Sequence, residues 1–433
     1  MIPYFIITVL LIILILMRME VAWAIGIVSI IGATFLFGGF WDIRVAAMVA
    51  QRSFCGTDSF VLLAVPMFIL AGRLMNVGGV TTRLFNFASC LVRPLKGGLG
   101  HANVLASMLF AGMSGSAVAD VAGLGIVEMR AMLDEGYGRE FSAGITGASA
   151  LVGPIIPPSI AFVIYGVIAQ QSIAVLFMAG VLPGIILAVG QMIYVSILAH
   201  KNNYPSGRIP HISELVRTLK KALLPLMAPV ILLGGIYGGI FTPTEAASVV
   251  VIYSIILGMF VFREYNFKVL LKEIKIAMIQ TSAIMIIVGY VSVFGIVMIR
   301  GGVPTALANG LMRLTDNPQI LMLLFLLLWL VTGFFMSQSP ALLILTPILL
   351  PIVQSYGIDP IHFGVVMTLS LTVGQLTPPI GIVLYTLVKV AEIPFERLVI
   401  VLLPYVFISI LVIILLIFVP DLVLFLPKLL LNY

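Results

Sequence analysis

The chain has 433 residues, of which 61% are hydrophobic and only 9% are charged, with a net charge of +6. A soluble domain is about 25% charged, so this composition excludes a mainly water-exposed surface and indicates a polytopic, all-helical membrane protein surrounded by lipid. The basic residues occur in short stretches between apolar runs, which is typical of topology signals and not of a nucleic-acid partner. Cys55 and Cys90 have neither CxxC spacing nor a nearby histidine cluster, so we interpret them as small apolar residues.

Nine apolar runs have the length expected of membrane helices, because about 20 residues cross the hydrocarbon core. The first has no charged leading region and no small-residue cleavage site, so we interpret it as a membrane segment and not as a cleaved signal. The nine runs are 3–17, 21–40, 60–76, 172–199, 222–240, 244–262, 276–299, 319–336 and 398–418.

Four other apolar regions are interrupted by glycine and proline. In lipid, an interrupted backbone is tolerated only where it is buried in protein or lines a cavity. We therefore expect the functional site in these regions, as in a transporter or a channel. They are 101–126 and 331–353, interpreted as re-entrant hairpins, and 141–168 and 361–391, interpreted as broken helices.

The most polar stretch, 200–221, lies near the middle of the chain and carries five basic residues against one acid, Glu214. By the positive-inside rule we expect it to be a cytoplasmic loop. It divides the chain into a first half, 1–199, and a second half, 222–433. Farther on, 266–275 places three lysines around leucine and isoleucine. This pattern fits an amphipathic interfacial helix or, equally, a short solvated loop.

The two halves share motifs in the same order at a nearly constant offset. The pairs are GGVTTRLFN at Gly78 with GGVPTALAN at Gly301, Gly112 with Gly333, and GPIIPPS at Gly153 with GQLTPPI at Gly374, at offsets of 223, 221 and 221 residues. These matches indicate an internal duplication. Repeats with broken helices at corresponding positions point to a secondary transporter with its site near the bilayer midplane, and we expect the repeats to be inverted.

The segment from Ala111 to Ser116 is a glycine- and serine-rich tip between two flanks that are each too short to span a membrane. This pattern predicts a re-entrant hairpin whose carbonyls and hydroxyls can bind a hard cation. Close packing by small residues is the alternative, but the element recurs in the second half.

The double-proline motifs, 153–159 and 374–379, are the second kind of candidate cation site. Two adjacent prolines remove backbone donors and disfavour helical geometry at the preceding residue. Upstream carbonyls then lose their partners, and a bound Na⁺ is a natural replacement. Ser159 and Thr377 add hydroxyl oxygens. A structural kink explains one such motif easily and two matching motifs less well.

Two further features involve acidic residues. Asp120 lies in an apolar stretch, where an ionisable group is a functional candidate; a hydrogen bond within the helix is the alternative. In the FTPTEAA stretch, Thr242 is expected to be an N-cap, Pro243 the first helical residue, and Glu245 the partner in a capping box.

At these motifs the chain resembles the large membrane subunit of tripartite ATP-independent periplasmic (TRAP) transporters. The resemblance runs over nearly the whole length. It includes LLAVPMFILAGRLMNVGG, GGLGHANVLASMLFAGMSGSAVAD, VGPIIPPSIAFVIYGV, IFTPTEAA, LLILTPILLPIV and LTPPIG. It implies an elevator-type Na⁺ symporter in a bacterial inner membrane. The implied partners are a small four-helix membrane subunit and a periplasmic substrate-binding protein, and the implied substrate is an organic acid such as a dicarboxylate, keto-sugar acid or sialic acid.

The resemblance also implies site residues. The first Na⁺ site involves Ala111, Gly112, Ser114 and Ser116 with the carbonyls of Gly153, Ile156 and Pro158, and the second involves Gly333, Gly374, Thr377 and Pro379. Candidates for the substrate path are Ser114, Ser116, Asp120, Ser159, Ser337 and Gln338.

One departure concerns the second hairpin tip. Many family members carry an aspartate where this chain has Ser337, so a family role for an acidic group there is in doubt. Gln338 and Ser339 keep the tip polar but neutral.

Two other functional classes were compared with a transporter. An ion channel also uses broken helices and carbonyl rings, but it is more often a symmetric oligomer with one filter per subunit. An enzyme needs a nucleophile with a base, or metal ligands. The sequence has no Walker A, HExxH or GxSxG motif and no zinc spacing, so we expect no catalysis and no cofactor other than Na⁺ as the coupling ion.

Overall fold

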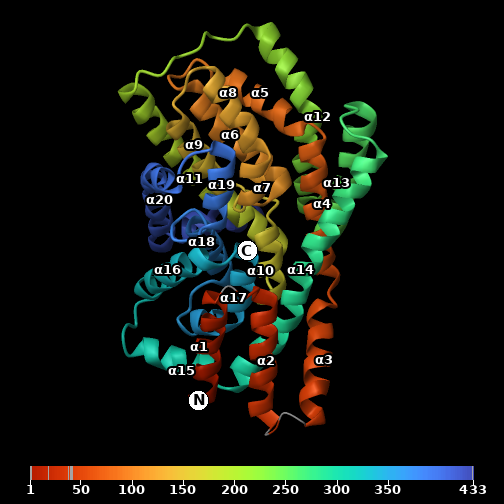
Figure 1. The fold of residues 1–433 in the computed structure, drawn as a ribbon, viewed down its shortest axis with the longest axis vertical. Coiled ribbons are helices and arrows are strands. Elements are labelled where there is room, and N and C mark those ends of the chain that lie inside the picture. The colour runs from red at the N-terminus through yellow and green to blue at the C-terminus, as the bar shows by residue number, and fades with distance from the viewer. Residues whose placement is uncertain (1, 18, 38, 40–41, 432) are drawn as a thin grey trace.

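A computed structural model describes every residue of the chain except 1, 18, 38, 40, 41 and 432. In this part of the chain the regular elements are helices, and β-pairing is limited to an isolated bridge between Lys96 and Ser206. The helices form an elongated bundle, with the N-terminus at one end and the C-terminus near the middle of the view (Figure 1).

The first half contains eleven α-helices and two short 3₁₀ segments within the described residues. They are α1 (Ile2–Leu16), α2 (Val21–Phe37), α3 (Ile43–Thr57), η1 (Phe60–Leu63), α4 (Ala64–Val77), α5 (Val80–Val92), α6 (Gly98–Ser114), α7 (Ala117–Ala122), α8 (Leu124–Asp134), α9 (Arg139–Ser149), η2 (Ala150–Val152), α10 (Ile160–Ala169) and α11 (Ile173–Lys201).

The second half contains ten α-helices and a short π-helical segment within the described residues. They are α12 (Ile212–Tyr237), α13 (Pro243–Ile255), η3 (Ile256–Val261), α14 (Phe267–Arg300), α15 (Val303–Met312), α16 (Pro318–Phe335), α17 (Gln338–Ser355), α18 (Pro360–Gly374), α19 (Ile382–Ala391), α20 (Phe395–Phe418) and α21 (Asp421–Leu431).

Eight segments of the described chain are long and apolar enough to cross a membrane. They are Phe60–Val77, Ile173–Lys201, Ile212–Tyr237, Pro243–Val261, Phe267–Arg300, Pro318–Phe335, Gln338–Ser355 and Phe395–Phe418. The helix α13 within this set begins as expected: Thr242 Oγ1 accepts a hydrogen bond from the Glu245 amide at 3.3 Å, and the Glu245 carboxylate accepts one from the Thr242 amide at 2.8 Å. This capping box confirms the prediction.

The same succession of elements occurs in both halves. One helix ends at a glycine pair and a second begins directly after it, α4–α5 and α14–α15, and Gly79 and Gly302 both have positive φ, +69° and +72°. A helical hairpin follows, α6–α7 and α16–α17. A broken helix with a Pro-Pro loop comes next, α9–α10 and α18–α19. In Figure 1, α5 and the start of α6 lie near one end of the molecule and α15 lies near the other.

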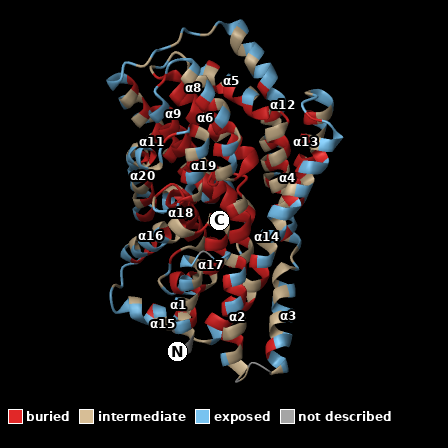
Figure 2. Ribbon diagram, viewed as in Figure 1, coloured by how far each residue is buried: buried red, intermediate tan, exposed pale blue. Residues whose placement is uncertain are grey.

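Two groups of helices meet in the middle of the protein. In the first, α14 packs against α2, α3 and α4, while α13 contacts α4 and α12 contacts α5 and α13. In the second, α6, α9, α11, α18 and α20 pack together with the hairpins, and α16 contacts α18. The first group lies mainly to the right in Figure 1, and the second to the left. Buried residues concentrate in the second group, while α3, α15 and the start of α12 are largely exposed (Figure 2).

Several expected boundaries were wrong. The polar stretch 200–221 is not a single loop, because α11 continues to Lys201 and α12 begins at Ile212. Of the two alternatives for 266–275, the structure has the helix and not the solvated loop: Asn266 accepts a hydrogen bond from the Val269 amide at 3.2 Å and caps the 34-residue helix α14. The run 319–336 is not separate from the second hairpin but forms its first arm. The terminal helix α21 was not anticipated.

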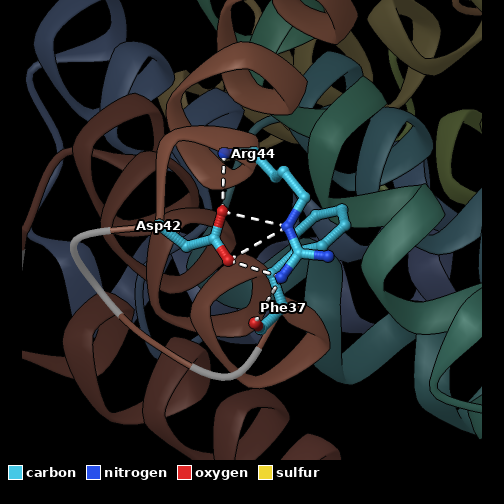
Figure 3. Close-up of polar contacts among 3 residues, drawn as sticks. All are labelled: Phe37, Asp42 and Arg44. Atoms are coloured by element: carbon cyan, nitrogen blue, oxygen red, sulfur yellow. Dashed lines mark hydrogen bonds and ion pairs between the residues drawn. The ribbon is translucent and has the colours of Figure 1, made fainter.

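Asp42 and Arg44 contact each other at the start of α3, and Arg44 also reaches the end of α2. Asp42 accepts a hydrogen bond from the Arg44 amide at 2.8 Å and pairs with its guanidinium at 2.6 Å. Arg44 also donates to the Phe37 carbonyl at 3.4 Å, and its guanidinium carbon lies 5.4 Å from the Phe37 ring centroid (Figure 3). The hydrogen bonds from Arg44 lower the pKa of the Asp42 carboxyl. These contacts orient the start of α3 relative to the end of α2.

Candidate functional site

A cavity of about 550 Å³ lies where the two groups of helices meet. Both hairpin tips reach it, the first through Ser114–Ser116 and the second through Ser337–Pro340. The facing wall comes from α4 and α14, and Gln375, after α18, completes the lining. This volume falls within the range of about 300–1,000 Å³ that is usual for small-molecule sites. The tips, which are distant in sequence, therefore share one chamber.

A single ion pair lies in this cavity wall. An Arg73 Nη2 on α4 is 2.5 Å from a Glu273 carboxylate oxygen on α14, and the two side chains are 28% and 7% exposed. Arg73 is the one basic residue and Glu273 the one acidic residue among the residues that line the cavity. Asn76 and Gln280 on the same two helices add uncharged polar groups. None of the four was predicted from the sequence, although Arg73 is a charged residue within the apolar run 60–76 and such a residue is a functional candidate.

The first hairpin tip packs against the Pro-Pro loop of its own half. Gly115, with φ of +57°, approaches this loop so closely that a Cβ there would lie 2.9 Å from the Pro158 carbonyl oxygen. The Ser114 hydroxyl is buried, faces the cavity lining and has no hydrogen-bond partner. Hydroxyl and carbonyl oxygens of this kind suit Na⁺, because hard cations prefer oxygen.

The other first-site candidates are placed as follows. Gly112 faces the Pro229 ring of α12, with the Pro157 carbonyl oxygen 3.8 Å from an added Cβ, and Gly153 lies beside the Ser116 backbone. The Ser116 hydroxyl accepts a hydrogen bond from the Ala119 amide at 3.4 Å and caps α7. The Ala111 carbonyl accepts from the Gly115 amide at 3.4 Å, and the Ile156 side chain packs on Gly184 of α11. The loop is thus held between the hairpin and α11.

The second hairpin tip touches its loop through two glycines. A Cβ built on Gly333 would lie only 2.8 Å from the Gly374 Cα. The Gly381 amide also donates to the Phe334 carbonyl at 3.1 Å. The Thr377 hydroxyl is buried and donates to the Gly374 carbonyl at 2.7 Å, which leaves its oxygen lone pairs available to a cation. Pro379 lies at the exposed end of this loop.

The second tip also presents the start of α17 to the cavity. Ser337 is the N-cap residue, but its side chain makes no capping hydrogen bond. The first amides of this 18-residue helix therefore have no cap, and a helix N-terminus favours anions. Gln338 is fixed, because its amide donates to the Thr368 carbonyl at 3.0 Å and to Thr372 Oγ1 at 2.8 Å.

Two of the substrate-path candidates do not line this cavity. Four other residues of α7 line it, Ala117, Val118, Ala119 and Ala122, while Asp120 is absent from the wall and 2% exposed. Ser159 is fully buried in the first loop, where its hydroxyl donates to the Pro154 carbonyl at 2.5 Å and caps α10. The helical repeat places Asp120 away from the chamber, and the loop uses Ser159 for its own turn.

A comparison with protein families matches the DctM component of the tripartite ATP-independent periplasmic transporters over residues 8–422. The chain belongs to this family. It is 42% identical to the sialic acid TRAP transporter large permease protein SiaM of Vibrio cholerae, over 89% of this chain and 90% of that protein. It is 36% identical to the 2,3-diketo-L-gulonate TRAP transporter large permease protein YiaN of Escherichia coli, over 94% of each chain.

The fold also has a relative of known structure. The YdaH transporter of Alcanivorax borkumensis superposes with a TM-score of 0.64 at 14% identity, over 88% of this chain and 89% of that chain. As a TRAP large permease, the chain is a multi-pass transport component of a bacterial inner membrane, and its relatives are transporter permeases. TRAP permeases work with a periplasmic binding protein and a small membrane subunit.

Proposed function

We propose that this large permease couples the import of an organic acid to Na⁺, with the cavity between the hairpin tips as the substrate site. The cavity is the observation that supports this proposal, because both hairpin tips and the ion pair of Arg73 and Glu273 line it. An organic acid needs a cationic partner, and an arginine can bind a carboxylate through two parallel hydrogen bonds. The uncapped start of α17 offers a second place for a negative group.

The substrate class rests on charge and size together. A 550 Å³ cavity with one arginine, several hydroxyls and three glutamines suits a polar carboxylate. The relatives named above carry the names of sialic acid and of 2,3-diketo-L-gulonate, and a further relative in Pseudomonas aeruginosa, 37% identical, carries that of C4-dicarboxylates. All three are organic acids, and we propose a substrate of that class here.

Na⁺ coupling is supported by the two oxygen-rich junctions between hairpin tip and Pro-Pro loop. Neither junction contains an acidic side chain among its proposed ligands, so a cation there would depend on carbonyl dipoles and hydroxyls. The elevator mechanism is supported by the two helix groups, since both hairpins belong to one group and α4 and α14 to the other. Movement of the second group, which contains both hairpins, past the first group would carry the cavity across the membrane.

Reconstitution tests the whole proposal. The chain is placed in liposomes with a small four-helix membrane subunit, and a periplasmic binding protein is added outside. We expect these liposomes to take up a labelled organic acid only under an inward Na⁺ gradient. The large permease alone is expected to show little uptake, because capture of the solute is expected of the periplasmic binding protein. Robust uptake by the isolated chain, or equal uptake in K⁺ without Na⁺, would contradict the assignment.

Thr377→Val tests the second Na⁺ site. The substitution is nearly isosteric and keeps both prolines, but it removes the hydroxyl. Loss of one buried polar partner costs about 1–3 kcal/mol, and about 1.4 kcal/mol is a factor of ten. We expect the Na⁺ concentration for half-maximal uptake to rise roughly tenfold, with Thr377→Ser near wild type. If Thr377→Val leaves Na⁺ dependence unchanged at normal expression, the motif is only a structural kink.

A further inference from the structure

Asp120 on α7 and Glu128 on α8 form a pair of carboxyl groups buried behind the first hairpin. They are 2% and 1% exposed, and Glu128 is close enough to Asp120 to be affected by its charge. Neither lines the substrate cavity. The two helices are separated by a short break at Gly123 and pack against each other, and both contact α6.

The basic groups on the surrounding helices are directed elsewhere in the described structure. The His101 ring contacts the Ser196 hydroxyl, and Lys389 is exposed. The arginines each pair with another acid: Arg73 with Glu273, Arg83 with Glu264, Arg130 with Asp134 and Arg139 with Glu392. The acids Glu135 and Glu140 lie at helix ends and are exposed. The buried pair therefore has no counter-charge from the described residues, and buried charges are otherwise paired or bind metals.

Four oxygens at this place have no partner. Both carboxylate oxygens of Asp120 and one of Glu128 lack a hydrogen bond. The Ser107 hydroxyl on α6, fully buried, lies beside the Asp120 carboxyl but makes no hydrogen bond of normal geometry. Neighbouring polar groups do not supply one: Asn103 donates to Thr146 Oγ1 at 2.7 Å and accepts from the Ser149 hydroxyl at 2.6 Å.

We propose that Asp120, Glu128 and Ser107 form a cation site, separate from the substrate cavity, that takes a hard divalent cation such as Ca²⁺ or Mg²⁺. The donors are all oxygen, which selects hard cations, and two carboxylates balance a divalent charge. None of the three residues belongs to either proposed Na⁺ site, so this inference does not depend on Na⁺ coupling.

Such a cation would act as a structural clamp on the first hairpin. Its ligands come from α6, α7 and α8, so it would join the first arm of the hairpin to the second arm across the break at Gly123. The Asp120 amide already donates to the Ser116 carbonyl at 3.0 Å, one turn from the tip. A cation that fixes Asp120 would therefore also fix Ser116, which lies at the cavity end of α7.

Direct binding tests the site without transport. We expect the purified full chain in nanodiscs, stripped with chelator, to bind one Ca²⁺ per chain by calorimetry, with competition by Mg²⁺. Asp120→Asn and Glu128→Gln should each weaken Ca²⁺ binding at least tenfold, and Ser107→Ala severalfold. Asp134→Asn is the matched control, because Asp134 lies on α8 like Glu128 but its side chain is 73% exposed. Ca²⁺ should raise the melting temperature of the wild type and not that of the double variant Asp120→Asn/Glu128→Gln.

Several results would overturn the proposal. The first is a wild-type chain that binds neither Ca²⁺ nor Mg²⁺, which is expected if protons neutralise the two acids. The second is binding of Na⁺ in preference to both divalent cations. The third is a Ca²⁺ affinity that is unchanged in both acid variants. Should the acid variants fail to purify, Ser107→Ala decides, since wild-type Ca²⁺ affinity in that variant contradicts the site.

Discussion

Arg73→Gln is expected to reduce uptake of the organic acid roughly 10- to 100-fold. The substitution removes the one cationic side chain in the cavity wall, and a hydrogen bond to a charged group contributes about 1.5–3 kcal/mol. It also leaves Glu273, 7% exposed, without its partner, so a negative charge would then repel an anionic substrate. Initial uptake rates against substrate concentration, in the reconstituted three-component system, measure the effect.

Two variants separate substrate binding from stability. Arg73→Gln/Glu273→Gln removes both charges, so it avoids an unpaired buried carboxylate; we expect it to fold well and still transport poorly. Arg83→Gln is the matched control, because Arg83 pairs with Glu264 at 2.9 Å outside the cavity. Wild-type uptake in Arg73→Gln would place the substrate carboxylate elsewhere, with the start of α17 as the next candidate.

Gly333→Ala is expected to abolish most Na⁺-dependent uptake. A Cβ at this position would meet the Leu371 carbonyl oxygen at 2.7 Å and the Gly374 Cα at 2.8 Å. Both are backbone atoms and cannot turn away as a side chain can, so α16 and α18 must separate. Overpacking of this kind costs about 1–3 kcal/mol, and it displaces the hairpin tip from the loop that carries Thr377. Thermal unfolding of the purified protein and uptake as a function of Na⁺ measure the two effects.

Gly310→Ala provides the control for that experiment. Gly310 lies within α15 and has no atom within 4 Å of an added Cβ, and alanine favours helix relative to glycine by about 1 kcal/mol. We expect unchanged uptake and equal or higher stability. A Gly333→Ala protein that melts and transports like Gly310→Ala would show that the close approach of α16 and α18 is not required.

Much of the architecture could be predicted from local sequence. Long apolar runs specify membrane helices because an unpaired backbone is not tolerated in lipid; α11, α20 and α13 together with η3 lie close to the expected ranges. The glycine pairs at 78–79 and 301–302 end α4 and α14 because glycine adopts positive φ without steric cost. The Pro-Pro motifs break their helices because proline lacks an amide donor. These are properties of a few consecutive residues.

The contents of the chamber were decided by tertiary structure. Arg73 and Glu273 are adjacent only because α4 and α14 pack against each other, and nothing in the sequence around either residue identifies its partner. Asp120 is noticeable in the sequence as an ionisable residue in an apolar stretch, but the direction of its side chain depends on how α7 turns after the hairpin tip and on which neighbours cover it. The sequence by itself determined which segments are helices and where their backbones break, because these features depend on local hydrogen bonding and steric limits. Only the packing of helices that are distant in the sequence decided which polar groups share the cavity and which are buried together behind it.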